Sequence, residues 1–208
     1  MFGIITFGNS ITWGRGEMPN VSWAGRLKQY FESQDLYNAL FNLGIPGNTS
    51  RDLLKRFPTE LSSRINYDRE GDKFLILIAI GINDCKGVGS PDNTKVKIDE
   101  FKDNFEKLIQ IAKKHTKHVV AIGLTPVDEK RTNPFENTYF TNKTVKKYDD
   151  VIKETSKNNK IRFIDILTKM SQEDYPKLLV DGLHPNSKGY DFMYGIIKDF
   201  LVKEKLIN

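Results

Sequence analysis

The chain contains little cysteine, little histidine and no long apolar run. Its one cysteine cannot form an internal disulfide and excludes a zinc site built from several cysteines. The longest apolar run, Phe74 to Ile80, has the length of a strand and is far shorter than the ~20 residues that cross a membrane. The start of the chain also lacks the pattern of a signal peptide. We therefore expect a cytoplasmic protein with no stable membrane insertion; a mature secreted form is the alternative.

The composition is that of a folded protein. The 208 residues are 38% hydrophobic and include 13 Phe and 8 Tyr, enough for a packed core, and we expect a single domain over residues 1–208. Lys plus Arg is 32 and Asp plus Glu is 27, which gives a net charge of +5. The basic residues alternate with acidic ones, as is typical of solvated helix faces, so we expect no nucleic-acid partner. The sequence does not define an oligomeric state.

Segments of strand character alternate with segments of helical periodicity. The predicted strands are residues 2–7, 37–43, 74–80, 118–124 and 161–166. The predicted helices are residues 22–33, 50–65, 96–115 and 141–158, and a last helix through Tyr190 and Leu201. Pro58 interrupts the second helix and allows either a kink or two short helices. The alternation predicts an α/β fold with a parallel sheet and helices on both of its faces.

In an open parallel sheet, a site lies beyond the carboxyl ends of the strands. Ser10 follows the first strand and the flexible Gly8, so we expect its hydroxyl to be exposed on a turn. Strand-to-turn nucleophiles of hydrolases are held in this way, although the GxSxG pattern is absent here. A lone serine at such a place is also a common helix cap or turn residue.

Three further loops at this edge carry polar groups. The loop from Leu43 to Ser50 has two glycines that let N–H groups approach a ligand, or it forms a turn and a helix cap. Asn83 can donate to a developing oxyanion or simply close its strand. Asp181 lies three residues before His184 and can orient its imidazole as a base, although an Asp-Gly turn before a helix is the alternative. Together these loops supply every group that acyl transfer needs.

Four sequence blocks follow one another along the chain: FGNSITWG, LGIPGNTS, GIND and DGLHPN. With these blocks in the family's order, the chain resembles the GDSL/SGNH hydrolases over nearly its whole length. The resemblance implies a three-layer α/β/α sandwich, flavodoxin-like, with a five-stranded parallel sheet. It also implies that Ser10 is the nucleophile, His184 the base and Asp181 the third member of the triad. Gly44 and Asn83 then form the oxyanion hole with the N–H of Ser10.

One position departs from the family. Its first block usually reads Gly-Asp-Ser, and here Asn9 stands in place of the Asp. Asn has nearly the same shape, keeps one acceptor and loses a charge, so we expect a tuned site. A non-catalytic ligand-binding domain weakened by Asn9 is the alternative.

The resemblance implies hydrolysis of a small-molecule carboxyl ester through an acyl-enzyme on Ser10, with no metal or organic cofactor. The family's substrates include short acyl esters, acetylated sugars, lysophospholipids and acyl thioesters. No apolar lid is evident in the sequence, which favours short-acyl (acetyl) esters of small or carbohydrate alcohols. A lysophospholipase or an acyl-thioesterase is the alternative enzyme.

The segment from Thr125 to Tyr139 is long, polar and poor in regular pattern, which is typical of a binding loop. We expect Arg131 or Tyr139 to contact the substrate and Trp13 to line the mouth of the site. The alternative places all three among surface or packing residues. Two further carboxylates at strand ends, Asp84 and Asp165, have no nearby histidine and are interpreted as structural.

Overall fold

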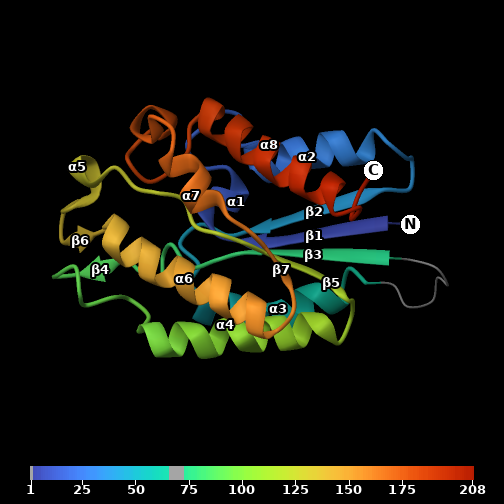
Figure 1. The fold of residues 1–208 in the computed structure, drawn as a ribbon, viewed down its shortest axis with the longest axis horizontal. Helices are drawn as coiled ribbons and strands as arrows, with labels where there is room; N and C mark the ends of the chain where they lie inside the picture. The colour runs from blue at the N-terminus through green and yellow to red at the C-terminus, as the bar shows by residue number, and fades with distance from the viewer. Residues whose placement is uncertain (1, 66–72) are drawn as a thin grey trace.

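A five-stranded parallel sheet forms the centre of the molecule (Figure 1). The computed structural model describes residues 2–65 and 73–208. The strands lie in the order β2-β1-β3-β5-β7, which is the strand order of flavodoxin-like sheets and confirms the predicted fold class. Their bounds are β1 (Phe2–Gly8), β2 (Ala39–Gly44), β3 (Lys73–Ala79), β5 (His118–Ile122) and β7 (Arg162–Ile164).

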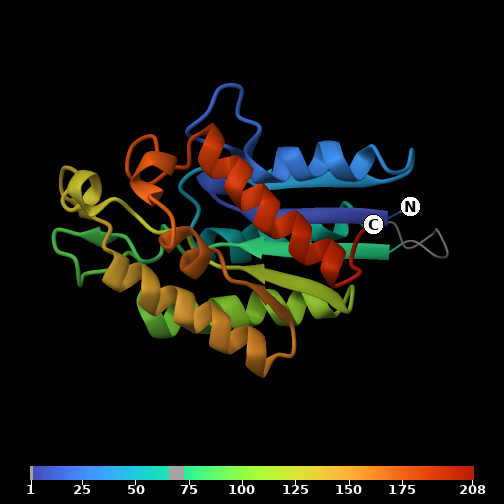
Figure 2. The ribbon, with the colours of Figure 1, turned by 45° about the horizontal axis from the view of Figure 1, so that its top comes forward.

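Long helices cover both faces of this sheet (Figures 1 and 2). Helices α2 and α8 pack together on one face, and α3, α4 and α6 pack on the other. The bounds of these helices are α2 (Ser22–Glu32), α3 (Ser50–Ser62), α4 (Ile98–Lys113), α6 (Asn142–Asn158) and α8 (Ser187–Lys203). Among the described residues, no helix has the length and apolar character needed to cross a membrane.

The central strands are apolar because helices cover them on both sides. Phe74 to Ile78 of β3 are all buried, and so are Ile4, Ile5 and Phe7 of β1. These side chains belong to one hydrophobic cluster that also includes the inward faces of the five long helices. This buried centre fixes the strand register, which in turn fixes where each strand ends.

The carboxyl ends of three neighbouring strands meet at the same level. Gly8, the last residue of β1, pairs with Gly44 at the end of β2 and with Ala79 at the end of β3. The short helix α1 (Ser10–Trp13) follows at once from β1 at this edge. Both ends of the chain lie at the opposite edge (Figure 1). The loops that the sequence analysis singled out therefore converge.

The structure differs from the predicted elements in two places. Helix α3 continues through Pro58 as one helix, which excludes two short helices, and the Thr49–Asp52 capping box fixes its start. The segment from Thr125 to Tyr139 is not without regular structure, because it contains α5 (Glu129–Thr132) and β6 (Thr138–Tyr139). Strand β6 pairs with β4 (Gly87–Val88) in a small antiparallel sheet. The other short elements are α7 (Ile166–Ser171) and η1 (Tyr175–Leu178).

Candidate active site

Ser10 is the first residue of α1, on the turn that follows β1. The side chain of Asn9 accepts a hydrogen bond from the N–H of Ile11 at 3.0 Å and so caps this short helix. Gly8 has no room for a side chain, since a Cβ there would lie 2.0 Å from Thr12 Oγ1. Asn9 thus supplies the acceptor that holds the turn, even though it lacks the charge of the usual Asp.

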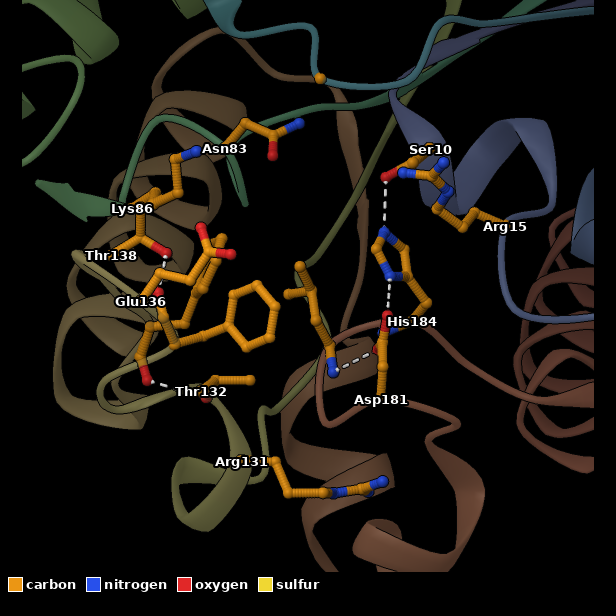
Figure 3. A pocket seen from close by; sticks show the side chains of 14 residues that line it. Ser10, Arg15, Asn83, Lys86, Arg131, Thr132, Glu136, Thr138, Asp181 and His184 are labelled. Carbon is orange, nitrogen blue, oxygen red and sulfur yellow. Dashed lines mark hydrogen bonds and ion pairs between the residues drawn. The ribbon is translucent and has the colours of Figure 1, made fainter.

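Ser10, His184 and Asp181 form a continuous chain of hydrogen bonds (Figure 3). Ser10 Oγ lies 3.0 Å from His184 Nε2, and His184 Nδ1 lies 2.7 Å from Asp181 Oδ2. Because an ionised carboxylate only accepts hydrogen bonds, Nδ1 donates to Asp181, and Nε2 of the neutral ring is left to accept from the Ser10 hydroxyl. The structure therefore brings together the three residues expected to form the triad, in the order that general-base catalysis uses.

The carboxylate of Asp181 also organises the turn that carries His184. Asp181 Oδ1 accepts the N–H groups of Leu183 at 3.0 Å and His184 at 2.8 Å, and Gly182 has a φ of +90°. Burial by itself would raise the pKa of Asp181, but the hydrogen bonds from the His184 ring and from these two N–H groups hold it well below its usual range. Asp181 is therefore a permanent negative charge beside the imidazole and favours its protonated form.

The segment after α1 packs closely against this histidine turn. Gly16 has a φ of +111°, and a Cβ there would lie 2.3 Å from Pro185 O and 3.2 Å from His184 Cβ. The N–H of Arg15 donates to Ser10 O at 2.9 Å. Backbone contacts thus hold the Ser10 turn against the His184 turn, although the two residues are 174 positions apart in the chain.

Asn83 borders the same cavity as Ser10, from the loop after β3 (Figure 3). Its side-chain amide donates one hydrogen bond to Asn48 O at 2.9 Å. A primary amide carries two N–H donors, so one donor remains for a ligand. The structure therefore brings Asn83 to the cavity in front of the nucleophile, as expected.

Gly44 does not reach this cavity, which corrects the expectation that it serves the oxyanion hole. Its N–H donates to Asn42 Oδ1 at 3.0 Å, and a Cβ on Gly44 would lie 2.3 Å from the backbone N of Trp13. Gly44 is still paired with Gly8 at the strand end, so it packs under α1. The glycine of this loop that lines the cavity is Gly47, with a φ of +81°.

Sequence reasoning missed Gly47 because both glycines of the loop fit a close backbone approach. The distinguishing signal is position relative to the paired strand. A glycine at the strand end sits inside the sheet's pairing, whereas one three residues further on lies beyond it. Within the described residues, no acceptor takes a hydrogen bond from the N–H of Gly47.

Asp84 holds the Asn83 loop against the start of α3. Its two carboxylate oxygens accept the N–H of Ser50 at 2.9 and 3.1 Å, and burial raises its pKa to about 6. Asp165 caps α7 by accepting the N–H of Thr168 at 2.9 Å. Both carboxylates thus have structural roles, as the sequence analysis expected. Cys85 is buried, and burial raises the pKa of its thiol far above the neutral range.

The triad opens into a cavity of about 460 Å³. The catalytic loops form one wall, and the small β4–β6 sheet with the turn before it forms the other (Figure 3). The lining residues are Ser10, Arg15, Gly47, Asn83, Lys86, Arg131, Thr132, Phe135, Glu136, Thr138, Phe140, Asp181, Leu183 and His184.

Of the three expected substrate contacts, only Arg131 lines this cavity, whereas Trp13 and Tyr139 do not. The Arg131 guanidinium is directed away from Ser10 (Figure 3) and donates to the carbonyl groups of Val180 and Leu179 at 3.0 and 3.1 Å. It also pairs with Asp128 at 2.8 Å. The cavity is also lined by residues that the sequence analysis did not name, such as Lys86 and Phe140. Within residues 2–65 and 73–208, no cluster of three or more His, Cys, Asp or Glu side chains is arranged to hold a metal.

A Ser-His-Asp chain at the carboxyl edge of a parallel sheet is the arrangement of a serine hydrolase. The family model of the GDSL-like Lipase/Acylhydrolase family matches residues 6–192, and the chain belongs to this family. It is accordingly a carboxylic ester hydrolase. A search of curated proteins by sequence found no match.

Solved structures share the fold at low sequence identity. A lipase/acylhydrolase from Enterococcus faecalis has a TM-score of 0.76 at 23% identity, with 97% of this chain and 95% of that chain covered. An acetylxylan esterase from Geobacillus stearothermophilus has a TM-score of 0.71 at 20% identity, with coverage of 96% and 92%. A member of the lipolytic G-D-S-L family from Veillonella parvula has a TM-score of 0.73 at 17% identity, with coverage of 96% and 97%.

Proposed function

We propose that the protein hydrolyses short-acyl esters, such as acetyl esters of small or carbohydrate alcohols, through an acyl-enzyme on Ser10. The observation that carries this proposal is the hydrogen-bonded chain from Ser10 Oγ to His184 at 3.0 Å and from His184 to Asp181 at 2.7 Å. This chain lies at an open cavity of about 460 Å³, which has room for an ester and part of its alcohol.

Catalysis begins when His184 Nε2 takes the proton of Ser10 as Oγ attacks the acyl carbonyl. The tetrahedral intermediate collapses, the bond to the alcohol oxygen breaks, and His184 returns the proton to the leaving alcohol. Water then attacks the acyl-enzyme with His184 as the base, which releases the carboxylic acid and restores the serine. Asp181 stabilises the imidazolium that forms in each half of the reaction.

The negative charge on the carbonyl oxygen needs hydrogen-bond donors that are already in position. We assign this role to the side-chain amide of Asn83 and to the backbone N–H groups of Ser10 and Gly47. Asn83 and Gly47 border the cavity with Ser10, and each has an N–H without a partner in the described residues. Loss of one such donor typically lowers turnover by about 10² to 10³.

The preference for short acyl groups is supported by the character of the cavity. Its lining includes charged and hydroxyl side chains, such as Lys86, Glu136 and Thr138, beside the apolar side chains of Phe140 and Leu183. A mixed lining of this kind suits a polar alcohol better than a long alkyl chain. The acetylxylan esterase that shares the fold acts on an acetylated carbohydrate, which agrees with this proposal.

A series of p-nitrophenyl esters from acetate to palmitate tests the proposal. We expect the native protein to hydrolyse acetate or butyrate best and the Ser10→Ala variant to lose this activity by at least about 10³-fold. Ser62→Ala is the matched control, because Ser62 is exposed on α3, and it is expected to keep full activity. A maximum at long chains would replace the short-acyl assignment with a lysophospholipase or thioesterase.

Covalent labelling by a fluorophosphonate probe distinguishes the enzyme from a non-catalytic binding domain. We expect the native protein to be labelled at Ser10 and the Ser10→Ala variant to remain unlabelled. Equal turnover in both forms, with no labelling of either, would refute the acyl-enzyme.

A further inference from the structure

Two cations line the active-site cavity without an acidic partner. Arg15 lies on the Ser10 side, and Lys86 lies on the opposite side, next to Asn83 (Figure 3). In the parts of the chain that the structure describes, no carboxylate forms an ion pair with either side chain, although five other arginines there do have such partners. These are Arg26, Arg51, Arg56, Arg131 and Arg162.

Lys86 is partly buried and is held in place by its backbone. Its carbonyl accepts the N–H of Lys95 at 2.9 Å, and the next residue, Gly87, pairs with Tyr139 in the β4–β6 sheet. Burial and the nearby Lys95 cation both lower the pKa of Lys86. A partly desolvated ammonium group beside another cation is unfavourable unless an anion joins it. Unpaired, partly buried charges of this kind are concentrated at functional sites.

Arg15 also projects from a fixed backbone. Its N–H donates to Ser10 O at 2.9 Å, and its carbonyl accepts the hydroxyl of Tyr190 at 2.6 Å. The side chain is exposed, so its guanidinium is free to meet a ligand at the mouth of the cavity. The planar fork of a guanidinium fits the oxygen pairs of a carboxylate or a phosphate.

The acidic side chains of the cavity do not cancel these two charges. Asp181 is engaged with His184, as described above. Glu136 lies in the turn from Phe135 to Thr138, on the same side of the cavity as Lys86 (Figure 3), and forms no ion pair with a described residue. With respect to the described residues, the cavity therefore presents two unpaired cations and one unpaired carboxylate to a substrate.

We infer that the cavity selects esters that carry an anionic group, a carboxylate or a phosphate, which Lys86 and Arg15 bind. This inference rests on the proposed function, because it names a property of the substrate of that same site. The anionic group belongs either to the leaving alcohol or to the acyl chain, and two pairs of esters distinguish these sources. Glu136, on the same side of the cavity as Lys86, repels the anion and weakens its binding.

The experiment compares anionic and neutral esters of matched shape. The alcohol pair is 4-acetoxybenzoate and its methyl ester, and the acyl pair is the 4-nitrophenyl monoester of adipic acid and its distal methyl ester. For each pair, the ratio of kcat/KM for the anionic ester to that for the neutral ester is measured in every variant. The intrinsic reactivities of the two esters are the same in every variant, so their effect cancels when this ratio is compared between variants.

We expect Lys86→Met to lower the ratio by about tenfold in one of the two pairs, which corresponds to about 1.4 kcal/mol. Arg15→Met changes it in the same direction, Glu136→Gln raises it, and Lys86→Arg retains it. Lys130→Met is the matched control, because Lys130 is an exposed cation on α5 outside the cavity lining, and it leaves the ratio unchanged. Ratios that stay the same in Lys86→Met and Arg15→Met for both pairs would overturn the inference.

Equilibrium binding separates failure of the inference from failure of the proposed function. In the Ser10→Ala background, calorimetry measures the binding of 4-hydroxybenzoate and its methyl ester, and of monomethyl and dimethyl adipate. Tighter binding of the anion in one pair, lost on adding Lys86→Met, sustains the inference even if no ester is hydrolysed. Equal binding of anion and neutral compound in both pairs overturns it, whereas Ser10-dependent hydrolysis of the neutral esters would leave the proposed function standing.

Discussion

At the scale of single residues, the two glycines of the loop after β2 lack a side chain for different reasons. Gly44 is covered by α1, so a methyl group there would collide with the backbone of Trp13 at 2.3 Å. Gly47 has open space around the position of a Cβ, and only its φ of +81° disfavours a side chain. The first glycine is thus required by packing, and the second by the left-handed conformation of its backbone.

This difference predicts opposite results for two alanine variants. Gly44→Ala is expected to lower stability by several kcal/mol, because the contact is with backbone that cannot move aside. Gly47→Ala is expected to cost only about 1 kcal/mol of stability but to lower kcat by at least about tenfold, because the strained backbone turns its N–H away from the oxyanion. Urea unfolding and steady-state kinetics on the acetate ester measure both effects. Full kcat in folded Gly47→Ala would remove Gly47 from the oxyanion hole.

At the scale of secondary-structure elements, Arg131 joins α5 to the segment that leads into the triad. Its guanidinium donates to three carbonyl groups between Pro176 and Val180, directly before Asp181. A second contact supports this link, since Asp128 donates its N–H to Gly182 O at 2.8 Å. Helix α5 therefore supports the turn that positions His184, which makes Arg131 a positioning residue.

An Arg131→Lys variant tests positioning against direct substrate contact. Lysine keeps the charge but cannot reach three carbonyl groups with a fixed fork of donors. We expect kcat to fall by about 10- to 100-fold with the preference between acetate and butyrate unchanged, and hydrogen exchange over residues 176–184 to become faster. A changed chain-length preference with normal exchange would instead restore Arg131 as a substrate contact.

The long elements could be predicted from the sequence, and the short ones could not. The apolar run of β3 and the helical periodicity of α4 and α6 arise from burial over many residues, which leaves a clear pattern. Helices α1 and α5 have four residues each, and β4 and β6 have two each, too few for any periodicity. These elements exist because of contacts with distant segments, such as the pairing of Gly87 with Tyr139.

The candidate site likewise contains residues that could be predicted from the sequence and residues that could not. Ser10, Asp181 and His184 could be named because their residue types and motifs carry the chemistry, and the structure brings them together. Lys86 could not be named, since nothing in its local sequence distinguishes it from the chain's many other lysines. Its place in the cavity depends on the pairing of β4 with β6, which the sequence pattern does not reveal.

At the scale of the whole molecule, the stability of the fold is linked to a buried carboxylate under the active-site edge. Asp84 is fully buried and holds the N–H of Ser50 at the start of α3. Burial raises its pKa from 3.8 to about 6. A raised pKa in the folded state means that the native protein binds this proton more tightly than the unfolded chain does. The contribution of this proton binding to the free energy of unfolding is therefore fully present below pH 3.8 and is lost as the pH rises through about 6.

The prediction concerns the difference in unfolding free energy between Asp84→Asn and the native protein. Asparagine stays neutral at every pH, so this difference should move in favour of the variant between about pH 4 and pH 7. The difference between 3.8 and about 6 sets the full change at about 3 kcal/mol. Any fixed cost of replacing the carboxylate shifts this free-energy difference equally at every pH and leaves its slope intact. Urea unfolding of both proteins at pH 4, 5, 6 and 7 measures this slope.

Asp150→Asn, which removes an exposed carboxylate on α6, controls for the change in net charge. Other acids titrate in the same range in both proteins and cancel from the difference, including Asp181, whose lowered pKa acts in the opposite direction. A difference that stays constant with pH would mean that the two hydrogen bonds from Ser50 offset desolvation, and one that moves in favour of the native protein as the pH rises would mean that they outweigh it. Asp84 would then anchor the Asn83 loop as a stable anion, and the loop would keep this support throughout the range in which His184 must act as a base.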